Sequence, residues 1–205
     1  FGGTSLANAD RIKNVVEIIR TCLENKPIVV VSAIGGITDL LINVAKESVK
    51  GVNPNEKVEE IIEIHKKIIF DLNLNDDFLM DEFTRLYDTL NGVYLLKELS
   101  PRSLDLISSF GEIWSSKIVA EYLNSIKLPS KNYTGGEIGI ITNDEFTNSE
   151  ILEETYNLIK DYSINFKHIP VITGFIAKNK DGDITTLGRG GSDYSASIIG
   201  AALDA

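Results

Sequence analysis

The chain has 205 residues, of which 43% are hydrophobic and 24% charged, as in one well-cored domain or part of a larger one. Its formal net charge of -10 predicts an acidic surface, so we expect neither nucleic acid nor an anionic membrane as a partner. A single cysteine, Cys22, excludes an internal disulfide and favours a cytoplasmic setting, and no apolar stretch approaches the ~20 residues that span a bilayer.

Helix and strand patterns alternate along the first fifty residues. The first apolar pattern has helical spacing and predicts a helix whose buried positions are Ile12, Val15, Val16, Ile19 and Leu23. The β-branched run Ile28–Val31 predicts a strand buried on both faces, as in a parallel sheet. A glycine-containing loop follows, and Thr38 or Asp39 is expected to cap a helix from Leu40 to about Val49.

Two long helical patterns come next. The apolar positions of the first are Val58, Ile61, Ile62, His65, Ile68, Ile69 and Leu72, and those of the second are Leu79, Phe83, Leu86, Leu90 and Val93. They predict a helical hairpin inserted at about 55–99, whose helices pack on each other or on a partner subunit. His65 lies on this apolar seam, so we interpret it as a hydrogen-bonded packing residue rather than a ligand.

A further helix is expected to start at Ser100-Pro101, with Ser as the cap and Pro in the first position, and to run to about Tyr122. A polar stripe lies on one face of it, formed by Ser108, Glu112, Ser115 and Ser116. Gly111 costs up to about 1 kcal/mol relative to Ala in a helix, which suggests that another segment approaches the backbone there. A carboxylate on this stripe suits the ammonium group of a substrate; the alternative is a solvated helix face.

The remaining elements complete an α/β alternation, which predicts a layered sheet. In chain order they are an extended segment over 133–143, a helix after a capping box at Thr147 and Glu150, a strand at Ile169–Ile172, a hairpin over 175–184 turned at Asp181-Gly182, and a helix from about Ser192 to Ala205.

Three glycine-rich segments, 1–5, 35–38 and 188–193, each run into a predicted helix. A helix start offers unpaired N–H groups and a partial positive charge, so such segments suit phosphate or carboxylate groups. In a parallel sheet they would gather at the carboxyl ends of the strands. The third segment adds Arg189, which can grip a carboxylate with two hydrogen bonds, and Asp193, which could equally be a helix cap. The sequence has neither a P-loop nor a dinucleotide fingerprint.

Four stretches resemble the aspartate kinases of the amino acid kinase superfamily: Phe1–Ser5, Val30–Thr38, Ser109–Glu112, and Gly174–Ile176 together with Thr185–Ala196. The resemblance implies a three-layer αβα sandwich with a mainly parallel central sheet, incomplete at the C-terminal side. Residues 1–205 would be the amino-acid-binding part of one kinase domain. A phosphate-binding lysine would precede Phe1, and the nucleotide-binding part and regulatory domains would follow Ala205. The chain by itself is therefore expected to be inactive.

The resemblance also implies a reaction. ATP with Mg²⁺ would phosphorylate the side-chain carboxylate of L-aspartate, giving 4-phospho-L-aspartate, the first step of lysine, threonine and methionine biosynthesis. Arg189 would hold the α-carboxylate and Glu112 the ammonium group, while Asp193 would organise the catalytic groups rather than act as a base. The other implied roles are substrate binding by Ser32, Thr38, Gly190, Gly191 and Ser192, and phosphate binding by Gly2, Gly3, Thr4 and Ser5, with Gly3 also catalytic. No residue is assigned to a metal, and the full-length protein is expected to form a homo-oligomer.

Three alternatives remain open from the sequence. The protein could be another amino acid kinase, acting on glutamate, acetylglutamate or a nucleoside monophosphate. It could instead be a non-catalytic binding or assembly module that uses the helical hairpin as its interface. A third alternative is a kinase fused to homoserine dehydrogenase, of which the stretch 92–105 is weakly reminiscent.

Overall fold

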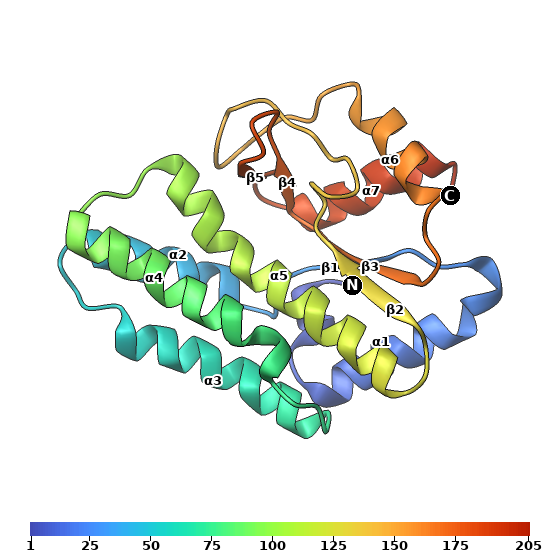
Figure 1. Cartoon of the computed structure of the whole chain (residues 1–205), viewed down its shortest axis with the longest axis horizontal. Coiled ribbons are helices and arrows are strands. Elements are labelled where there is room, and N and C mark those ends of the chain that lie inside the picture. Colours follow the sequence, from blue (N-terminus) through green and yellow to red (C-terminus); the bar gives the residue numbers. More distant parts are fainter.

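A three-stranded parallel sheet lies at the centre of the computed structural model, which describes all 205 residues (Figure 1). Its order is β1 (Val29–Val31), β3 (Ile169–Thr173), β2 (Ser130–Tyr133), with Val30 opposite Ile172. A separate antiparallel hairpin is formed by β4 (Ile176–Lys178) and β5 (Ile184–Thr186). The predictions of two buried parallel strands and of this hairpin are confirmed.

The helices are, in chain order, α1 (Ala9–Thr21), α2 (Ile37–Val49), α3 (Asn55–Asp71), α4 (Met80–Leu96), α5 (Pro101–Ser125), α6 (Thr155–Ser163) and α7 (Gly191–Leu203), with short 3₁₀ turns η1 (Gly3–Leu6), η2 (Leu23–Asn25) and η3 (Asp77–Leu79). The predicted cap of α5 is present, because the Ser100 side chain accepts the Ser103 N–H at 3.1 Å. The predicted cap of α2 is wrong. The residue before α2 is Gly36, at φ 85°, and no side chain caps the helix. Because α2 begins at Ile37, Thr38 and Asp39 lie inside it.

The segment 133–143, expected to be extended, is mostly a series of turns. Only Ile141 and Thr142 form isolated bridges, and the strand comes earlier, as β2. Ile138 and Ile140 reach the core from the turn, which Gly139 allows with φ 107°, so their apolar run does not mark a strand. The capping box is wrong as well, because Thr147 lies in a loop at φ 74° and the next helix begins only at Thr155.

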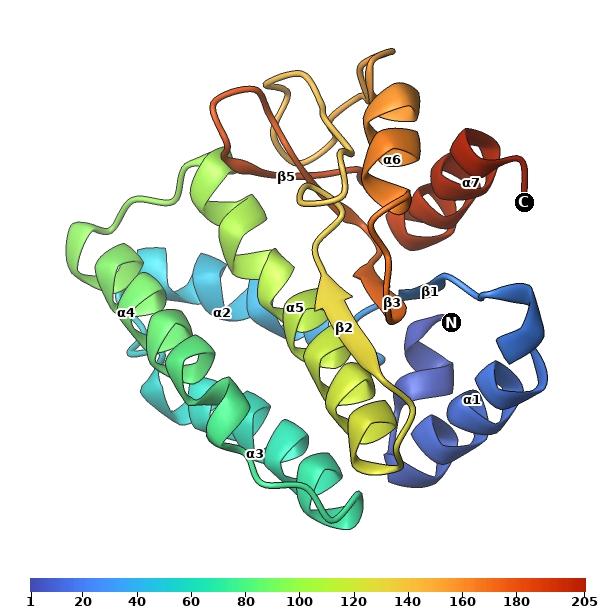
Figure 2. The ribbon, with the colours of Figure 1, turned by 45° about the vertical axis from the view of Figure 1, so that its right-hand side comes forward.

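Helices cover both faces of the sheet, as expected for a three-layer sandwich. Successive strand residues point to opposite faces, so Val171 joins the large core with α1 to α5. Its neighbour Ile172 joins a smaller core with Ile159 of α6 and Ile198 of α7. Figure 2 shows α6 and α7 together on one side and α3, α4 and α5 on the other.

The two helices predicted over 55–99 are present as α3 and α4, and both pack toward α5 (Figure 2). The Trp114 ring of α5 makes edge contacts with His65, at 4.8 Å between centroids, and with Phe83, at 4.9 Å. His65 Nδ1 donates to the Ile61 carbonyl at 2.7 Å, and burial lowers its pKa to about 4, so the ring is neutral. The interpretation of His65 as a hydrogen-bonded packing residue is confirmed.

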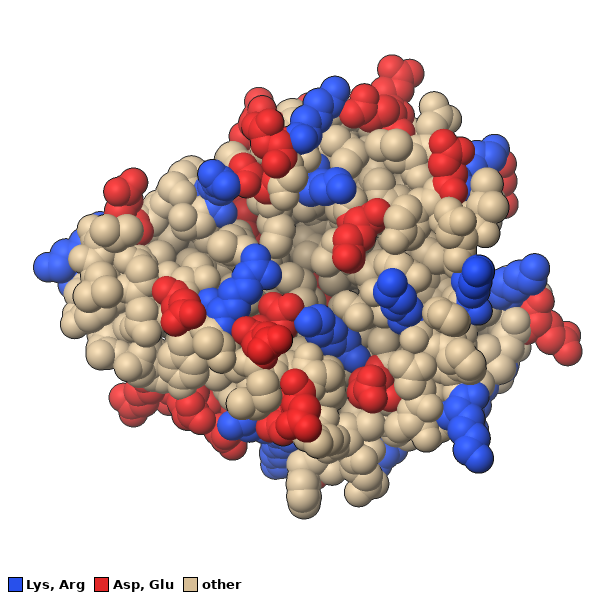
Figure 3. Space-filling view, in the orientation of Figure 1, with Lys and Arg blue, Asp and Glu red and all other residues tan.

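Acidic and basic side chains are interspersed over the face drawn in Figure 3. Most of the protein's ion pairs join residues one helical turn apart, such as Lys57 with Glu60. Pairs of this kind contribute little to stability, so the fold depends mainly on its two apolar cores. None of the helices combines the length and apolar character needed to cross a membrane.

Candidate active site

A cavity of about 290 Å³ lies beyond the carboxyl ends of β1 and β3. Its lining residues are Gly2, Ser32, Thr38, Glu112, Phe175, Gly188, Arg189, Gly190, Gly191, Ser192 and Asp193. Ser32 directly follows β1, and Phe175 comes two residues after β3. Residues from all three glycine-rich segments therefore meet at one edge of the sheet, as the sequence predicts.

The first two glycine-rich segments pack directly against each other. The Ser32 N–H donates to the Phe1 carbonyl and the Gly35 N–H donates to the Gly3 carbonyl, both at 3.1 Å. A Cβ atom on Gly3 would lie 2.7 Å from the Ala33 carbonyl oxygen, so only glycine fits this contact. Gly2 reaches the cavity, whereas Gly3 and the two residues after it lie in η1 and do not line it. The phosphate-binding roles of Gly3, Thr4 and Ser5 remain predictions from resemblance.

The start of α7 forms one wall of the cavity. Gly190, at φ 77°, precedes the helix, and the Ser192 hydroxyl donates to the Ser32 hydroxyl at 3.1 Å. Asp193 lies in the first turn and does not cap the helix, so the alternative reading of Asp193 as a cap is wrong. Arg189 is exposed beside the cavity and takes part in none of the ion pairs of the protein. Its guanidinium is therefore available to an anionic ligand.

Glu112 of α5 also lines the cavity. Its side chain is only 2% exposed, Oε1 accepts the Ala33 N–H at 3.2 Å, and Oε2 has no partner. Burial raises the pKa of this carboxyl to about 8, against the opposing effect of the Ala33 N–H, so it is protonated near neutral pH. The alternative of a solvated helix face is wrong. A buried carboxyl with a free oxygen at a cavity is suited to a cationic group.

Close contact between α5 and the loop after β1 places Glu112 at the cavity. A Cβ atom on Gly111 would lie 2.8 Å from the Ala33 Cβ, which confirms that another segment approaches the backbone there. The Ser115 hydroxyl donates to the Ser32 carbonyl at 2.6 Å and ties the same two elements together. The two other serines of the polar stripe bond to carbonyls of their own helix and lie outside the cavity lining.

Sequence reasoning missed one buried carboxylate, Asp105 of α5, which is 1% exposed. It accepts hydrogen bonds from the Thr147 N–H, at 3.0 and 2.9 Å, from the Thr186 N–H at 3.0 Å and from the Thr186 hydroxyl at 2.8 Å. Burial raises its pKa, while these hydrogen bonds act in the opposite direction. The sequence did contain a signal for Asp105. It precedes Glu112 by seven residues, or two helical turns, so both carboxyl groups lie on the same face of the helix.

The sequence pattern of the Amino acid kinase family matches residues 1–205, which is the whole chain. The chain belongs to the amino acid kinase family. Among curated relatives, Aspartokinase 1, chloroplastic, of Arabidopsis thaliana is 41% identical, and Aspartokinase 3, chloroplastic, of the same plant is 40% identical. Each alignment covers 99% of this chain, and 37% and 38% of the respective relatives.

A solved structure within this family has the same fold. E. coli aspartokinase III, in complex with aspartate and ADP, superimposes with a TM-score of 0.81 at 28% identity. The match covers 100% of this chain and 46% of that one. The chain thus spans less than half the length of each of these three proteins.

Proposed function

We propose that the protein containing this chain is an aspartate kinase, which transfers the γ-phosphate of ATP to the side-chain carboxylate of L-aspartate. One observation carries this proposal: a buried, partly unpartnered carboxyl, Glu112, and an unpaired guanidinium, Arg189, line the same cavity. An α-amino acid presents an ammonium group and a carboxylate, which a carboxylate and a guanidinium respectively can bind. The relatives named aspartokinase support the choice of amino acid.

In this proposal the chain binds and orients the acceptor. Arg189 grips the α-carboxylate, and Glu112 releases its proton to solvent and pairs as a carboxylate with the ammonium group. Hydroxyl groups of Ser32, Thr38 and Ser192 complete the lining, while Asp193 at the cavity rim orients the polar groups around the reacting carboxylate. The substrate's side-chain carboxylate is ionised at neutral pH, so it needs no general base.

The transfer itself is a displacement at phosphorus. A side-chain carboxylate oxygen of aspartate forms a bond to the γ-phosphorus, the bond from that phosphorus to the β–γ bridging oxygen breaks, and ADP leaves with the electron pair. Catalysis then depends on alignment and on stabilising the charge of the transferring group. The N–H groups at the start of α7 and Gly2 face the side of the cavity where we place this phosphate.

ATP would bring Mg²⁺, which neutralises phosphate charge when bound. No group of three His, Cys, Asp or Glu side chains in the chain comes together as a metal site, so we assign none of its residues to the ion. The same proposal includes a role in lysine, threonine and methionine biosynthesis, a homo-oligomeric full-length protein and a cytoplasmic location.

The test is a coupled ADP-release assay on the full-length protein with L-aspartate, L-glutamate and N-acetylglutamate as acceptors. We expect turnover with L-aspartate, trapped by hydroxylamine as the hydroxamate of the acyl phosphate, and at least about 100-fold lower kcat/KM with the other two. Thr38→Val, which removes one hydroxyl from the cavity wall, should raise the KM for aspartate. Turnover of glutamate or acetylglutamate in preference to aspartate would refute the proposal.

A further inference from the structure

Asp105 joins three segments that are far apart in the sequence. Its carboxylate, on α5, binds Thr186 at the end of β5 through both the backbone N–H and the hydroxyl. The same carboxylate binds the N–H of Thr147, in the loop before α6. Because both oxygens accept and the side chain is buried, these are charge-assisted bonds shielded from water.

The loop over 145–149 is itself held against the end of β5. The Ser149 N–H donates to the Thr186 carbonyl at 2.8 Å, so Thr186 is bonded on both sides. Thr147, a β-branched residue, is held at φ 74°, a strained conformation that persists only where neighbouring contacts impose it. Asn148 packs on Gly188, where a Cβ atom would lie 2.3 Å from the Asn148 Oδ1.

Thr186 is followed, after Leu187, by the segment Gly188–Arg189, which lines the cavity. The side chain that fixes Thr186 comes from the helix that also carries Glu112. The same helix therefore presents one carboxyl to the cavity and anchors the segment that carries the guanidinium.

We infer that Asp105 is a positioning residue for substrate binding: through Thr186 and Thr147 it holds the segment Gly188–Arg189 at a fixed separation from Glu112. This inference rests on the proposed function and assigns a role to a residue that does not touch the cavity. A misplaced guanidinium weakens its grip on the acceptor's α-carboxylate, so loss of Asp105 should impair aspartate binding selectively.

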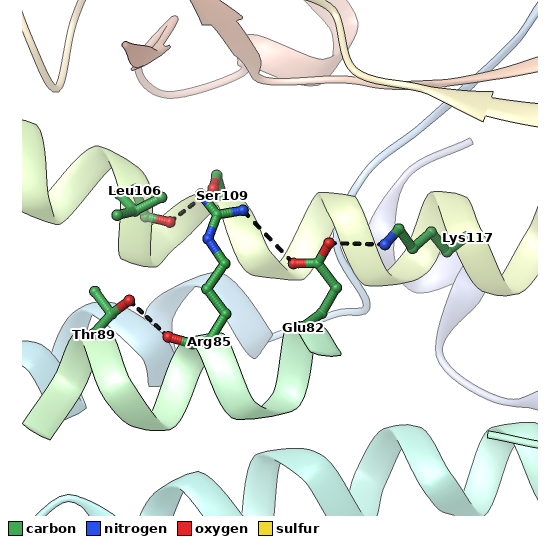
Figure 4. A network of polar contacts seen from close by, with 6 residues as sticks. All are labelled: Glu82, Arg85, Thr89, Leu106, Ser109 and Lys117. Atoms are coloured by element: carbon green, nitrogen blue, oxygen red, sulfur yellow. Dashed lines mark hydrogen bonds and ion pairs between the residues drawn. The ribbon is translucent and has the colours of Figure 1, made fainter. Parts of the chain in front are cut away.

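The first experiment compares two carboxylate-to-amide changes in the full-length protein. Asp105→Asn keeps the shape of the side chain but turns an amide N–H₂ toward an N–H donor. Glu82→Gln is the matched control, because the Glu82 carboxylate also binds α5, through Lys117 at 2.8 Å, but lies outside the cavity lining (Figure 4). We expect Asp105→Asn to raise the KM for aspartate by at least about 10-fold with the KM for ATP changed less than about 2-fold, and Glu82→Gln to change neither.

A double-mutant cycle separates positioning from general destabilisation. If Asp105 acts through Arg189, Asp105→Asn should add less than about 2-fold to the aspartate KM in an Arg189→Ala background. Fully additive effects, or an equal rise in KM in Glu82→Gln, would overturn the inference.

Should Asp105→Asn fail to fold, Thr186→Val removes one of the same bonds without a buried charge change. It should raise the aspartate KM in the same direction, and Thr186→Ser should restore it; a Thr186→Val enzyme with an unchanged aspartate KM would count against the inference.

Amide hydrogen exchange distinguishes failure of this inference from failure of the proposed function. If the full-length protein does not phosphorylate aspartate, the proposed function is refuted, but the anchoring of the segment remains measurable. We expect faster exchange over residues 187–192 in Asp105→Asn than in the wild type, and no change in Glu82→Gln. Unchanged exchange in Asp105→Asn would show that Asp105 does not hold the segment.

Discussion

The two sides of α5 are built in opposite ways. On the cavity side, Glu112 meets backbone groups, glycines and hydroxyls, and one of its oxygens has no partner. On the side that faces α3 and α4, Trp114 is fully buried among aromatic rings. These residues are two positions apart, yet one lines a cavity of mostly polar residues and glycines and the other lies in an aromatic core. The comparison indicates that binding and stability can be altered separately along a single helix.

A third, solvent-accessible contact links α4 to α5 at the margin of that core. Figure 4 shows Glu82 of α4 between Lys117 of α5, at 2.8 Å, and Arg85, at 3.9 Å. The Arg85 guanidinium also lies over the Phe110 ring, 5.7 Å from its centroid. This network provides an intermediate case, because it is polar but none of its residues lines the cavity.

The largest effect is expected from removing the aromatic centre of the core. Trp114→Ala should lower the free energy of unfolding by about 3–5 kcal/mol, since it leaves a cavity between α3, α4 and α5. Chemical denaturation of the full-length protein measures this, and Phe70→Ala, which changes a side chain on α3 that is 77% exposed, should cost less than about 0.5 kcal/mol. A loss below about 1 kcal/mol in Trp114→Ala would show that the core does not depend on this ring.

The next largest effect is expected on substrate binding, with the stability of the fold unchanged. Arg189→Ala should lower kcat/KM for aspartate by about 100-fold, because two charge-assisted hydrogen bonds to the α-carboxylate are lost. Its melting temperature should not change, because the side chain is exposed and unpaired. Arg20→Ala, at an exposed arginine of α1 that pairs with Glu17, is the control and should retain wild-type kinetics. A comparable loss in both variants would argue against a specific role for Arg189.

The raised pKa of Glu112 predicts that the stability of the protein depends on pH. Its folded-state pKa of about 8 lies above the ordinary value of 4.5, so between these values the folded state retains a proton that the unfolded state has lost. Stability should therefore fall as pH rises from about 4.5 to about 8. Glu112→Gln, which cannot ionise, should remove this component of the slope while abolishing aspartate binding. Thermal melts across this range test it, and an identical slope in both proteins would contradict the assignment.

The smallest effect is expected in the network of Figure 4. Lys117→Ala should cost no more than about 1 kcal/mol of stability and leave the aspartate KM unchanged, because the ion pair is partly exposed. Denaturation at low and high salt measures the electrostatic part of that cost. A change in the aspartate KM would show that the two sides of α5 are coupled after all.

Most of the fold could be predicted because its signals are local. The β-branched runs at β1 and β3 and the apolar spacing of α3 and α4 reflect burial along each element, which the sequence carries directly. The strand β2, with the sequence SKNY, carries no such signal, because one central residue is exposed and the other only half-buried. The segment 133–143, expected to be extended, shows the converse, since its apolar residues Ile138 and Ile140 fill the core from a turn.

The sequence by itself determined the residue types of the site: glycine-rich segments before helices, the arginine of the third segment and a carboxyl on a helix rich in apolar residues. Only the tertiary structure decided which of them meet. It brought Gly2 to the cavity but not Gly3, buried Glu112 with one free oxygen, and joined Asp105 to Thr147 and Thr186. The Asp105 bonds join residues 42 and 81 positions apart, and the bond between Glu112 and Ala33 spans 79 positions, so no local pattern encodes them.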